Sequence, residues 1–422
     1  MKLLIKNAKI MGGDSRDILI ENGCIAGVGA GLAGDETLDA NGLTALPGLV
    51  DIHCHLREPG FEYKDDLQHG VASAAVGGFT DIACMPNTSP INDQKTVTTY
   101  LKKMSSLYPG ARVHPIAAAS IGLKGELLTE MFELKEHGAV AFSDDGNPIM
   151  SAAFMRRALT YAKMTGLPVM DHCEELALSK NGQMNEGVTS TILGLKGYPS
   201  IAEEMMISRD LQIAEYVGGW IHICHVSTAA GVEMVRSAKA RGVKVTCEAT
   251  PHHFTLTEEA CLGYNTLAKV SPPLRTEADR HAIIAGLADG TIDAIATDHA
   301  PHHPDEKNQE FDVAQKGLVG FETAFALAVT KLLRPGYITL ERLVEVMSRS
   351  PRQIIGLPAM RFEPGDPADF ILADLDATWT VDPEGFASKA KNTPFGGMEL
   401  TGRVLSTFVG GSQLVKNATF IG

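Results

Sequence analysis

Apolar residues gather in short segments that alternate with longer amphipathic stretches through most of the chain. Eight apolar segments are rich in Val, Ile, Ala or Thr: Thr44–Ile52, Thr80–Met85, Arg112–Ala118, Ala139–Phe142, Pro168–Met170, Trp220–Ile223, Lys244–Cys247 and Ile292–Ala296. Helix-like stretches lie between most of them, including Ser151–Thr165, Ile201–Val217, Ala229–Arg241 and Thr276–Ala288. A strand–helix unit repeated about eight times predicts an α/β fold of the (β/α)8 TIM-like barrel type. A doubly wound sheet is the alternative, but no GxGxxG motif follows the first strand.

Both ends of the chain show a different pattern, in which short strands are separated by turns. The predicted strands are Leu3–Ile10, Asp17–Glu21, Ile25–Val28, Ala368–Leu375 and Gly402–Gly410. Because the two ends share a β-rich character that the middle lacks, we expect them to pair into one small β-sandwich. The predicted organisation is a composite β-sandwich domain of residues 1–48 and 362–422 and a barrel domain of residues 49–361.

Composition narrows the class of protein. Hydrophobic residues make up 44% of the 422 residues, which is enough for a large core. The 37 basic and 51 acidic residues give a net charge of −14, which disfavours nucleic acid and anionic membranes as partners. No apolar run approaches the roughly 18 residues of a membrane span, and the lysine-interrupted start does not resemble a signal peptide. Seven cysteines without a CxxC pair predict a cytoplasmic protein without a disulfide framework.

Side chains suited to metal binding follow the predicted strands. The first segment leads into His53-Cys54-His55, and alternate side chains of an extended chain share a face. Nine of the 14 histidines lie at or just beyond predicted strands one, five, six, seven and eight, with acids after strands four and eight. A single histidine there is usually structural, but the strand ends of a barrel converge on one face. His222 lies outside this pattern, and we expect it to be a surface or structural residue. Imidazole and carboxylate groups together predict a site for Zn²⁺ or a similar ion.

Several motifs resemble a known family. They are His53-Cys54-His55-Leu56-Arg57-Glu58-Pro59-Gly60, Met85-Pro86-Asn87-Thr88, Ser271-Pro272-Pro273-Leu274-Arg275, Thr297-Asp298-His299-Ala300-Pro301-His302 and Lys391-Asn392-Thr393-Pro394-Phe395. The first and fourth resemble the metal-binding signatures of the amidohydrolase superfamily, in the form found in dihydroorotases. The other three resemble the bacterial class I dihydroorotase pattern. The resemblance covers essentially the whole chain and keeps the order of the motifs.

The resemblance implies a site for two divalent metal ions, with Zn²⁺ as the expected metal. The implied ligands are His53, His55, Asp145, His172, His225 and Asp298. Many relatives bridge the ions with a carboxylated lysine, but residues 139–146 contain no lysine, and the class I pattern places an aspartate there. Spacing alone leaves Asp144 and Asp145 open, and the family pattern favours Asp145. Candidates to support the ligands are His252, His253, His299 and His303.

The resemblance also implies a set of substrate-binding residues, which are Arg57, Asn87, Ser271, His302, Lys316 and Gly317. Arg57 and Asn87 would hold a carboxylate of the substrate, because a planar guanidinium offers it paired donors. The chain departs from the family at Ser271, where Asn is usual, and at Lys316, where an apolar or aromatic residue is usual. Substrate contacts through the backbone would tolerate both departures, whereas a role for the Asn side chain would alter affinity or substrate choice.

The implied reaction is the reversible hydrolysis of dihydroorotate to N-carbamoyl-L-aspartate in pyrimidine biosynthesis. Asp298 would take a proton from the attacking water and pass it to the leaving ring nitrogen. The alternatives are a hydantoinase, dihydropyrimidinase or allantoinase, an inactive scaffold for aspartate transcarbamoylase, and a metal-storage protein. Arg57 and Asn87 favour a substrate that carries a carboxylate, and the absent lysine disfavours hydantoinases. The scaffold is disfavoured because every ligand position is filled.

The remaining expectations concern partners and motion. The substrate is a small molecule, and the family implies a homodimer and association with aspartate transcarbamoylase. Residues 302–317 are long, polar and poorly periodic, so they form either a mobile lid or an ordinary surface loop.

Overall fold

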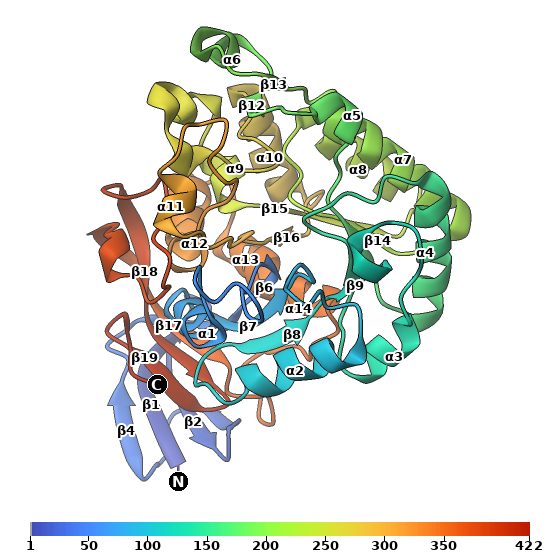
Figure 1. Ribbon diagram of the computed structural model, residues 1–422. Coiled ribbons are helices and arrows are strands. Elements are labelled where there is room, and N and C mark those ends of the chain that lie inside the picture. The colour runs from blue at the N-terminus through green and yellow to red at the C-terminus, as the bar shows by residue number, and fades with distance from the viewer. Residues whose placement is uncertain (1) are drawn as a thin grey trace.

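The computed structural model describes residues 2–422, and its centre is a closed ring of parallel strands (Figure 1). The eight strand positions are β6 (Leu49–Cys54), β7 (Phe79–Cys84), β8 (Arg112–Pro115) continuing into β9 (Ala117–Ala118), β10 (Phe142–Ser143), β11 (Val169–Asp171), β14 (Ile221–Ile223), β15 (Val245–Ala249) and β16 (Ala294–Ile295). Neighbours in this order pair in parallel. The Asp298 N–H donates to the His53 carbonyl at 3.0 Å and the His55 N–H to the His299 carbonyl at 2.8 Å, which closes the ring. The predicted barrel is confirmed.

Helices cover the outside of the ring (Figure 1). They include α1 (Leu67–Val76), α2 (Lys95–Ser105), α3 (Met131–Glu136), α4 (Ala152–Thr165), α7 (Ile201–Val217), α8 (Ala229–Ala240), α10 (Glu277–Asp289) and α12 (Phe321–Ala328). In α4, Ser151 caps the first turn by accepting from the Phe154 N–H at 3.2 Å. Phe154, Ala158 and Ala162 recur at helical spacing on its buried face, and the helix ends at Gly166, where φ is 79°. The four helices predicted by name agree with α4, α7, α8 and α10.

The first predicted strand is two strands that belong to different sheets. Residues Thr44–Pro47 form β5, which pairs with β17 (Phe370–Thr380), and β6 begins at Leu49 in the barrel. Gly48 separates them, and a Cβ at that position would lie 2.3 Å from Thr80 Cγ2. The apolar run is therefore continuous in sequence but changes sheet at a glycine that touches the neighbouring barrel strand.

The two ends of the chain meet in one sheet beside the barrel (Figure 1). Its other strands are β1 (Lys2–Ile10), β2 (Ser15–Glu21), β3 (Cys24–Gly29), β4 (Glu36–Asp39), β18 (Glu399–Val409), β19 (Ser412–Lys416) and β20 (Thr419–Phe420). Hydrogen bonds join all nine strands into a single sheet. Ile5 and Ile18 from the N-terminal part share a core with Phe370 and Phe408 from the C-terminal part. The expected pairing of the two ends is confirmed.

Shorter elements complete the fold. They are the strands β12 (Met184–Asn185) and β13 (Gly197–Tyr198), the helices α5 (Leu176–Ser179), α6 (Val188–Leu193), α9 (Pro251–Thr255), α11 (Pro304–Lys307), α13 (Leu340–Val344) and α14 (Ser350–Ile354), the 3-10 turns η1 (Ile121–Leu123), η2 (Glu258–Tyr264), η3 (Thr266–Ala268) and η6 (Pro383–Gly385), and the π-helical turns η4 (Val329–Leu333) and η5 (Glu345–Arg349). Of the helices within residues 2–422, none has the length and apolar character needed to traverse a bilayer.

Candidate metal centre and active-site cavity

The six residues expected to bind metal lie together at the carboxyl ends of the barrel strands. β6 carries His53 and leads into His55, and the segments after β10, β11, β14 and β16 carry the other four: Asp145, His172, His225 and Asp298. All six side chains are buried. Parallel strands bring their carboxyl ends to one face of a barrel, which is why residues up to 245 positions apart in the chain become neighbours here.

The ligand atoms form two neighbouring groups of three residues each. His53, His55 and Asp298 form the first group, in which His55 Nε2 lies 3.0 Å from Asp298 Oδ1. The second group consists of Asp145, His172 and His225, and its two imidazoles approach to 3.0 Å between His172 Nδ1 and His225 Nε2.

Asp145 belongs to the second group but also faces the first. Its Oδ1 lies 3.6 Å from His53 Nε2 and 3.7 Å from His225 Nε2, and its Oδ2 lies 3.5 Å from His55 Nε2. Asp144 points elsewhere, because its carboxylate accepts from the backbone N–H and the hydroxyl of Ser120. The geometry thus separates two neighbours that spacing in the sequence left equivalent.

The donor set fits divalent metal ions. His53 Nε2 and Asp145 Oδ1 are buried, face each other, and have no hydrogen-bond partner within the described chain. Orphaned buried polar atoms are costly unless something else satisfies them. Imidazole nitrogen and carboxylate oxygen are ligands that Zn²⁺ and related ions accept, so a cation at this position would satisfy both atoms.

Charge and backbone geometry both mark this cluster. Burial alone would raise the pKa of Asp145, yet the charges of His53 and His55 hold it well below its usual value. Burial is likewise outweighed at Asp298, where the hydrogen bond of His55 and the charge of His53 lower the pKa. His225 and Asp298 also adopt positive φ angles of 31° and 48°. Such backbone strain in non-glycine residues is concentrated at functional sites.

Two of the histidines are oriented by groups behind them. Asn87 Oδ1 lies 3.0 Å from His55 Nδ1, so the amide oxygen accepts from the ring and turns Nε2 toward the cluster. Glu174 Oε2 lies 2.9 Å from His172 Nε2 and leaves Nδ1 facing the cluster. The sequence motifs predict only a substrate-binding role for Asn87 and no role for Glu174. The signal for Glu174 in the sequence is an acid two residues after a candidate ligand.

A cavity of about 370 Å³ opens beside the cluster. Its walls include the six residues expected to bind substrate, namely Arg57, Asn87, Ser271, His302, Lys316 and Gly317. They also include five of the six candidate metal ligands, since only His53 lies behind the wall. The structure therefore brings the two predicted sets together in one place.

Arg57 is a buried cation that makes no ion pair among the described residues. Its Nε donates to the Pro301 carbonyl at 2.9 Å, and its Nη2 lies 3.5 Å from His302 Nε2. Glu58 is not its partner, because that carboxylate accepts from the Leu67 N–H and from a tyrosine hydroxyl. Burial lowers the pKa of Arg57 to about 10, so the guanidinium is still charged at neutral pH. An anion in the cavity would complete its hydrogen bonding.

The segment of residues 302–317 forms one wall of the cavity and is fastened to the barrel. His302 Nε2 lies 2.9 Å from the Lys316 carbonyl, and Lys307, only 1% exposed, donates to the Gln315 and Gly317 carbonyls. The Gly317 N–H donates to the Lys269 carbonyl at 2.9 Å. These backbone groups, expected to meet the substrate, are thus already engaged within the protein.

Asn392 lies in one of the family-like motifs, and its contacts make it a further functional candidate. Its Oδ1 accepts from the His302 N–H at 3.1 Å, and its Nδ2 donates to the Ala300 and Gly317 carbonyls at 3.1 Å each. One amide therefore holds both ends of the cavity wall in place.

The four supporting candidates lie in different environments. His252 is buried with neither ring nitrogen hydrogen-bonded to any described residue, and burial lowers its pKa to about 4. His253 contacts the Pro272 carbonyl at 3.1 Å, and His299 stacks on Phe321 with ring centroids 3.9 Å apart. His303 caps α11 at the surface. None of the four lines the cavity.

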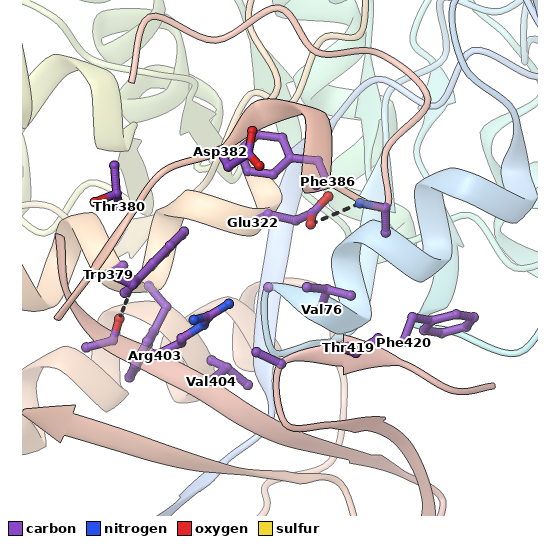
Figure 2. Close-up of a pocket in the computed structure, with 17 residues that line it drawn as sticks. Val76, Glu322, Trp379, Thr380, Asp382, Phe386, Arg403, Val404, Thr419 and Phe420 are labelled. Atoms are coloured by element: carbon purple, nitrogen blue, oxygen red, sulfur yellow. Dashed lines mark hydrogen bonds between the residues drawn. The ribbon is translucent and has the colours of Figure 1, made fainter. Parts of the chain in front are cut away.

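A second hollow, of about 420 Å³, lies where the terminal sheet meets α1 and α12 (Figure 2). Glu322 accepts there from the Ser73 hydroxyl at 2.8 Å and from the Ala387 N–H at 3.1 Å, and the Trp379 indole donates to the Gly402 carbonyl at 3.1 Å. The residues that line it include no histidine or cysteine. This hollow lies at the joint between the terminal sheet and the barrel helices, whereas the candidate metal ligands and substrate-binding residues surround the cavity beside the cluster.

Comparison with known proteins agrees with this arrangement. A family model described as Dihydro-orotase-like matches residues 42–231. The chain is 52% identical over 407 residues to a dihydroorotase of Acetivibrio thermocellus, covering 96% of each chain, and 53% identical over 428 aligned positions to one of Ruminiclostridium cellulolyticum, covering 100% of each. The solved structure of an L-hydantoinase (dihydropyrimidinase) from Arthrobacter aurescens aligns with a TM-score of 0.90 at 26% identity, over 100% of this chain and 97% of that one.

The barrel, the histidine and aspartate cluster and these relatives together define a metal-dependent cyclic amidohydrolase. Solved hydantoinases share its fold, whereas the relatives that match in sequence over nearly the whole chain are dihydroorotases. The chain belongs to the dihydroorotase family.

Proposed function

We propose that this protein is a dihydroorotase, which interconverts dihydroorotate and N-carbamoyl-L-aspartate in pyrimidine biosynthesis. The observation that carries the proposal is Arg57, a buried guanidinium with no carboxylate partner in the described chain, beside a cavity that adjoins the ligand cluster. Dihydroorotate carries a carboxylate on its ring, and a guanidinium binds a carboxylate through paired hydrogen bonds. The identity of about 50% to dihydroorotases over nearly the whole chain supports the same conclusion.

The ligand set would hold two divalent ions, for which we propose Zn²⁺. His53, His55 and Asp298 would hold the first, His172 and His225 the second, and Asp145 would bridge them. When bound, two such ions polarise the carbonyl of a cyclic amide and lower the pKa of water. The donor set supports the proposal, because it consists of nitrogen and carboxylate oxygen in two groups, and Asp145 of the second group also faces His53 and His55 of the first.

The protein's own groups would orient the substrate and move the proton. Arg57 and Asn87 would bind its carboxylate, with His302 and the cavity wall at Ser271, Lys316 and Gly317 enclosing the ring. Asp298, anionic and at the cavity surface, would accept a proton from the attacking water and deliver it to the leaving ring nitrogen. The same carboxylate would act in the opposite order during ring closure.

A substrate panel tests the proposal. Metal-replete protein is assayed with dihydroorotate, hydantoin, dihydrouracil and allantoin, and we expect a clear preference for dihydroorotate. A preference for a ring without a carboxylate would overturn the assignment in favour of a hydantoinase-type enzyme, the alternative that the shared fold supports. Metal analysis that finds no bound ions after gentle purification, together with no turnover, would favour an inactive scaffold.

The wider setting completes the proposal. We propose a cytoplasmic homodimer that associates with aspartate transcarbamoylase, built from a catalytic barrel of residues 49–361 and a terminal β-domain of residues 1–48 and 362–422. Size-exclusion chromatography with light scattering tests whether the protein is a dimer, and co-purification tests its association with aspartate transcarbamoylase.

A further inference from the structure

A chain of buried hydrogen bonds leads from the His53 ring away from the cavity. His53 Nδ1 lies 2.5 Å from Glu248 Oε1, and His222 Nε2 lies 3.0 Å from Glu248 Oε2. All three side chains are 0% exposed. Neither Glu248 nor His222 lines the cavity, so neither is placed to contact a substrate.

With His222 neutral, the hydrogen bonds of this chain have one consistent direction. A carboxylate is purely an acceptor, so His222 Nε2 carries the proton that Glu248 receives. In the neutral ring Nδ1 is then an acceptor, and Thr246 Oγ1 lies 2.9 Å from it. The Trp220 indole, which can only donate, contacts the same hydroxyl oxygen at 3.1 Å and leaves the hydroxyl proton for His222. Every donor therefore meets an acceptor, and the chain ends on Glu248.

We propose that Glu248 is a positioning residue for His53, an inference that rests on the proposed function and extends it. In the neutral form of His53 that a metal ion requires, Glu248 accepts from Nδ1–H, so Nε2 carries no proton. That atom faces Asp145 and Asp298, at 3.6 Å from each. A carboxylate behind a metal-ligating imidazole fixes both its tautomer and its ring orientation.

Glu248 also bears on a second ligand. Its Oε1 accepts from the backbone N–H of His225 at 3.3 Å, so one carboxylate contacts a member of each ligand group. The groups behind the other two histidines, Asn87 and Glu174, line the cavity and would change substrate contacts when altered. A change at Glu248 therefore separates ligand positioning from substrate binding.

The variant Glu248→Gln tests the proposal, because glutamine keeps the shape but offers one acceptor oxygen and turns an NH₂ group toward a histidine. Metal-free protein is titrated with Co²⁺, and affinity is measured by chelator competition through the visible absorption band. We expect affinity to fall by about 10–100-fold, with an altered band. At saturating metal, KM for dihydroorotate stays unchanged. Glu322→Gln is the matched control, since Glu322 also accepts three hydrogen bonds but at the joint of Figure 2, and its Co²⁺ affinity stays at the wild-type value.

Unchanged Co²⁺ affinity in Glu248→Gln would overturn the proposal. So would a third bound ion that this variant loses, because Glu248 would then be a ligand together with His222 and Cys224, whose donor atoms lie within reach of one another. If Glu248→Gln does not fold, Thr246→Val removes the hydroxyl behind His222 and is expected to weaken Co²⁺ binding by a smaller factor, and no weakening there refutes positioning. Wild-type protein that binds metal but leaves dihydroorotate unchanged refutes the proposed function alone, because Co²⁺ affinity still decides the role of Glu248.

Discussion

Replacing Arg57 with methionine is the sharpest test of how this cavity selects its substrate. The side chain is 9% exposed, its Nε is committed to the Pro301 carbonyl, and no described carboxylate pairs with it. Methionine has a similar length, and losing a buried cation that makes no ion pair leaves no partner charge stranded. We therefore expect Arg57→Met to fold and to bind metal like the wild type.

The magnitude follows from the hydrogen bonds that the substrate would lose. Two charge-assisted bonds at about 1.5–3 kcal/mol each amount to about 3–6 kcal/mol. At about 1.4 kcal/mol per factor of ten, kcat/KM for dihydroorotate should fall by about 10²–10⁴-fold. Arg57→Lys keeps the charge but not the planar fork, so its loss should be smaller than that of methionine.

The assay compares dihydroorotate with its methyl ester, which keeps the ring but removes the anionic carboxylate. Wild-type protein should lose most of its activity on the ester, whereas Arg57→Met should treat the acid and the ester almost alike. An equal loss in the variant on both substrates would refute the reasoning, because Arg57 would then act on the ring or the fold. Metal content and the urea midpoint of unfolding serve as controls for folding.

Three further predictions concern other residues. Asp298→Asn should keep most of the bound metal yet lose about 10²–10⁴-fold in kcat; retained turnover contradicts its proton-transfer role. Burial would raise the pKa of Asp81, but hydrogen bonds from His114 and Arg112 outweigh burial and lower it. The ionised carboxylate therefore stabilises the fold above about pH 3.9, and this stability is lost as the pH falls further. Asp81→Asn should lower the free energy of unfolding by about 3–5 kcal/mol at pH 7. In urea titrations, the free energy of unfolding of this variant should also fall less steeply with acid than that of the wild type; a variant as stable as the wild type refutes this. Gly317→Ala would place a Cβ 2.8 Å from Ala300 Cβ and should cost about 1–3 kcal/mol of stability and raise KM, whereas Gly290→Ala, also at positive φ but facing open space, should leave KM unchanged; equal effects on KM contradict the steric argument.

Much of the architecture was readable from local pattern. Barrel strands are buried on both faces, so they appear as short apolar runs, and the helices between them repeat their apolar residues at a helical period. The His53-Cys54-His55 motif and the acids after later strands located the chemistry, because side chains that follow parallel strands must meet at one face of a barrel. The boundary at Gly48 was missed, since an apolar run does not reveal which sheet each half joins.

The sequence by itself thus determined the alternation of elements, the face on which the site lies and the residue types that meet there. The tertiary structure alone decided which neighbour turns inward, placing Asp145 between the ligand groups and Asp144 against Ser120. It also placed His222, expected to be a surface or structural residue, in the buried hydrogen-bonded chain behind His53. The reason is physical. Periodicity along the chain records whether a position is buried, but a hydrogen bond between residues 195 positions apart depends on ring closure and on the rotation of each side chain.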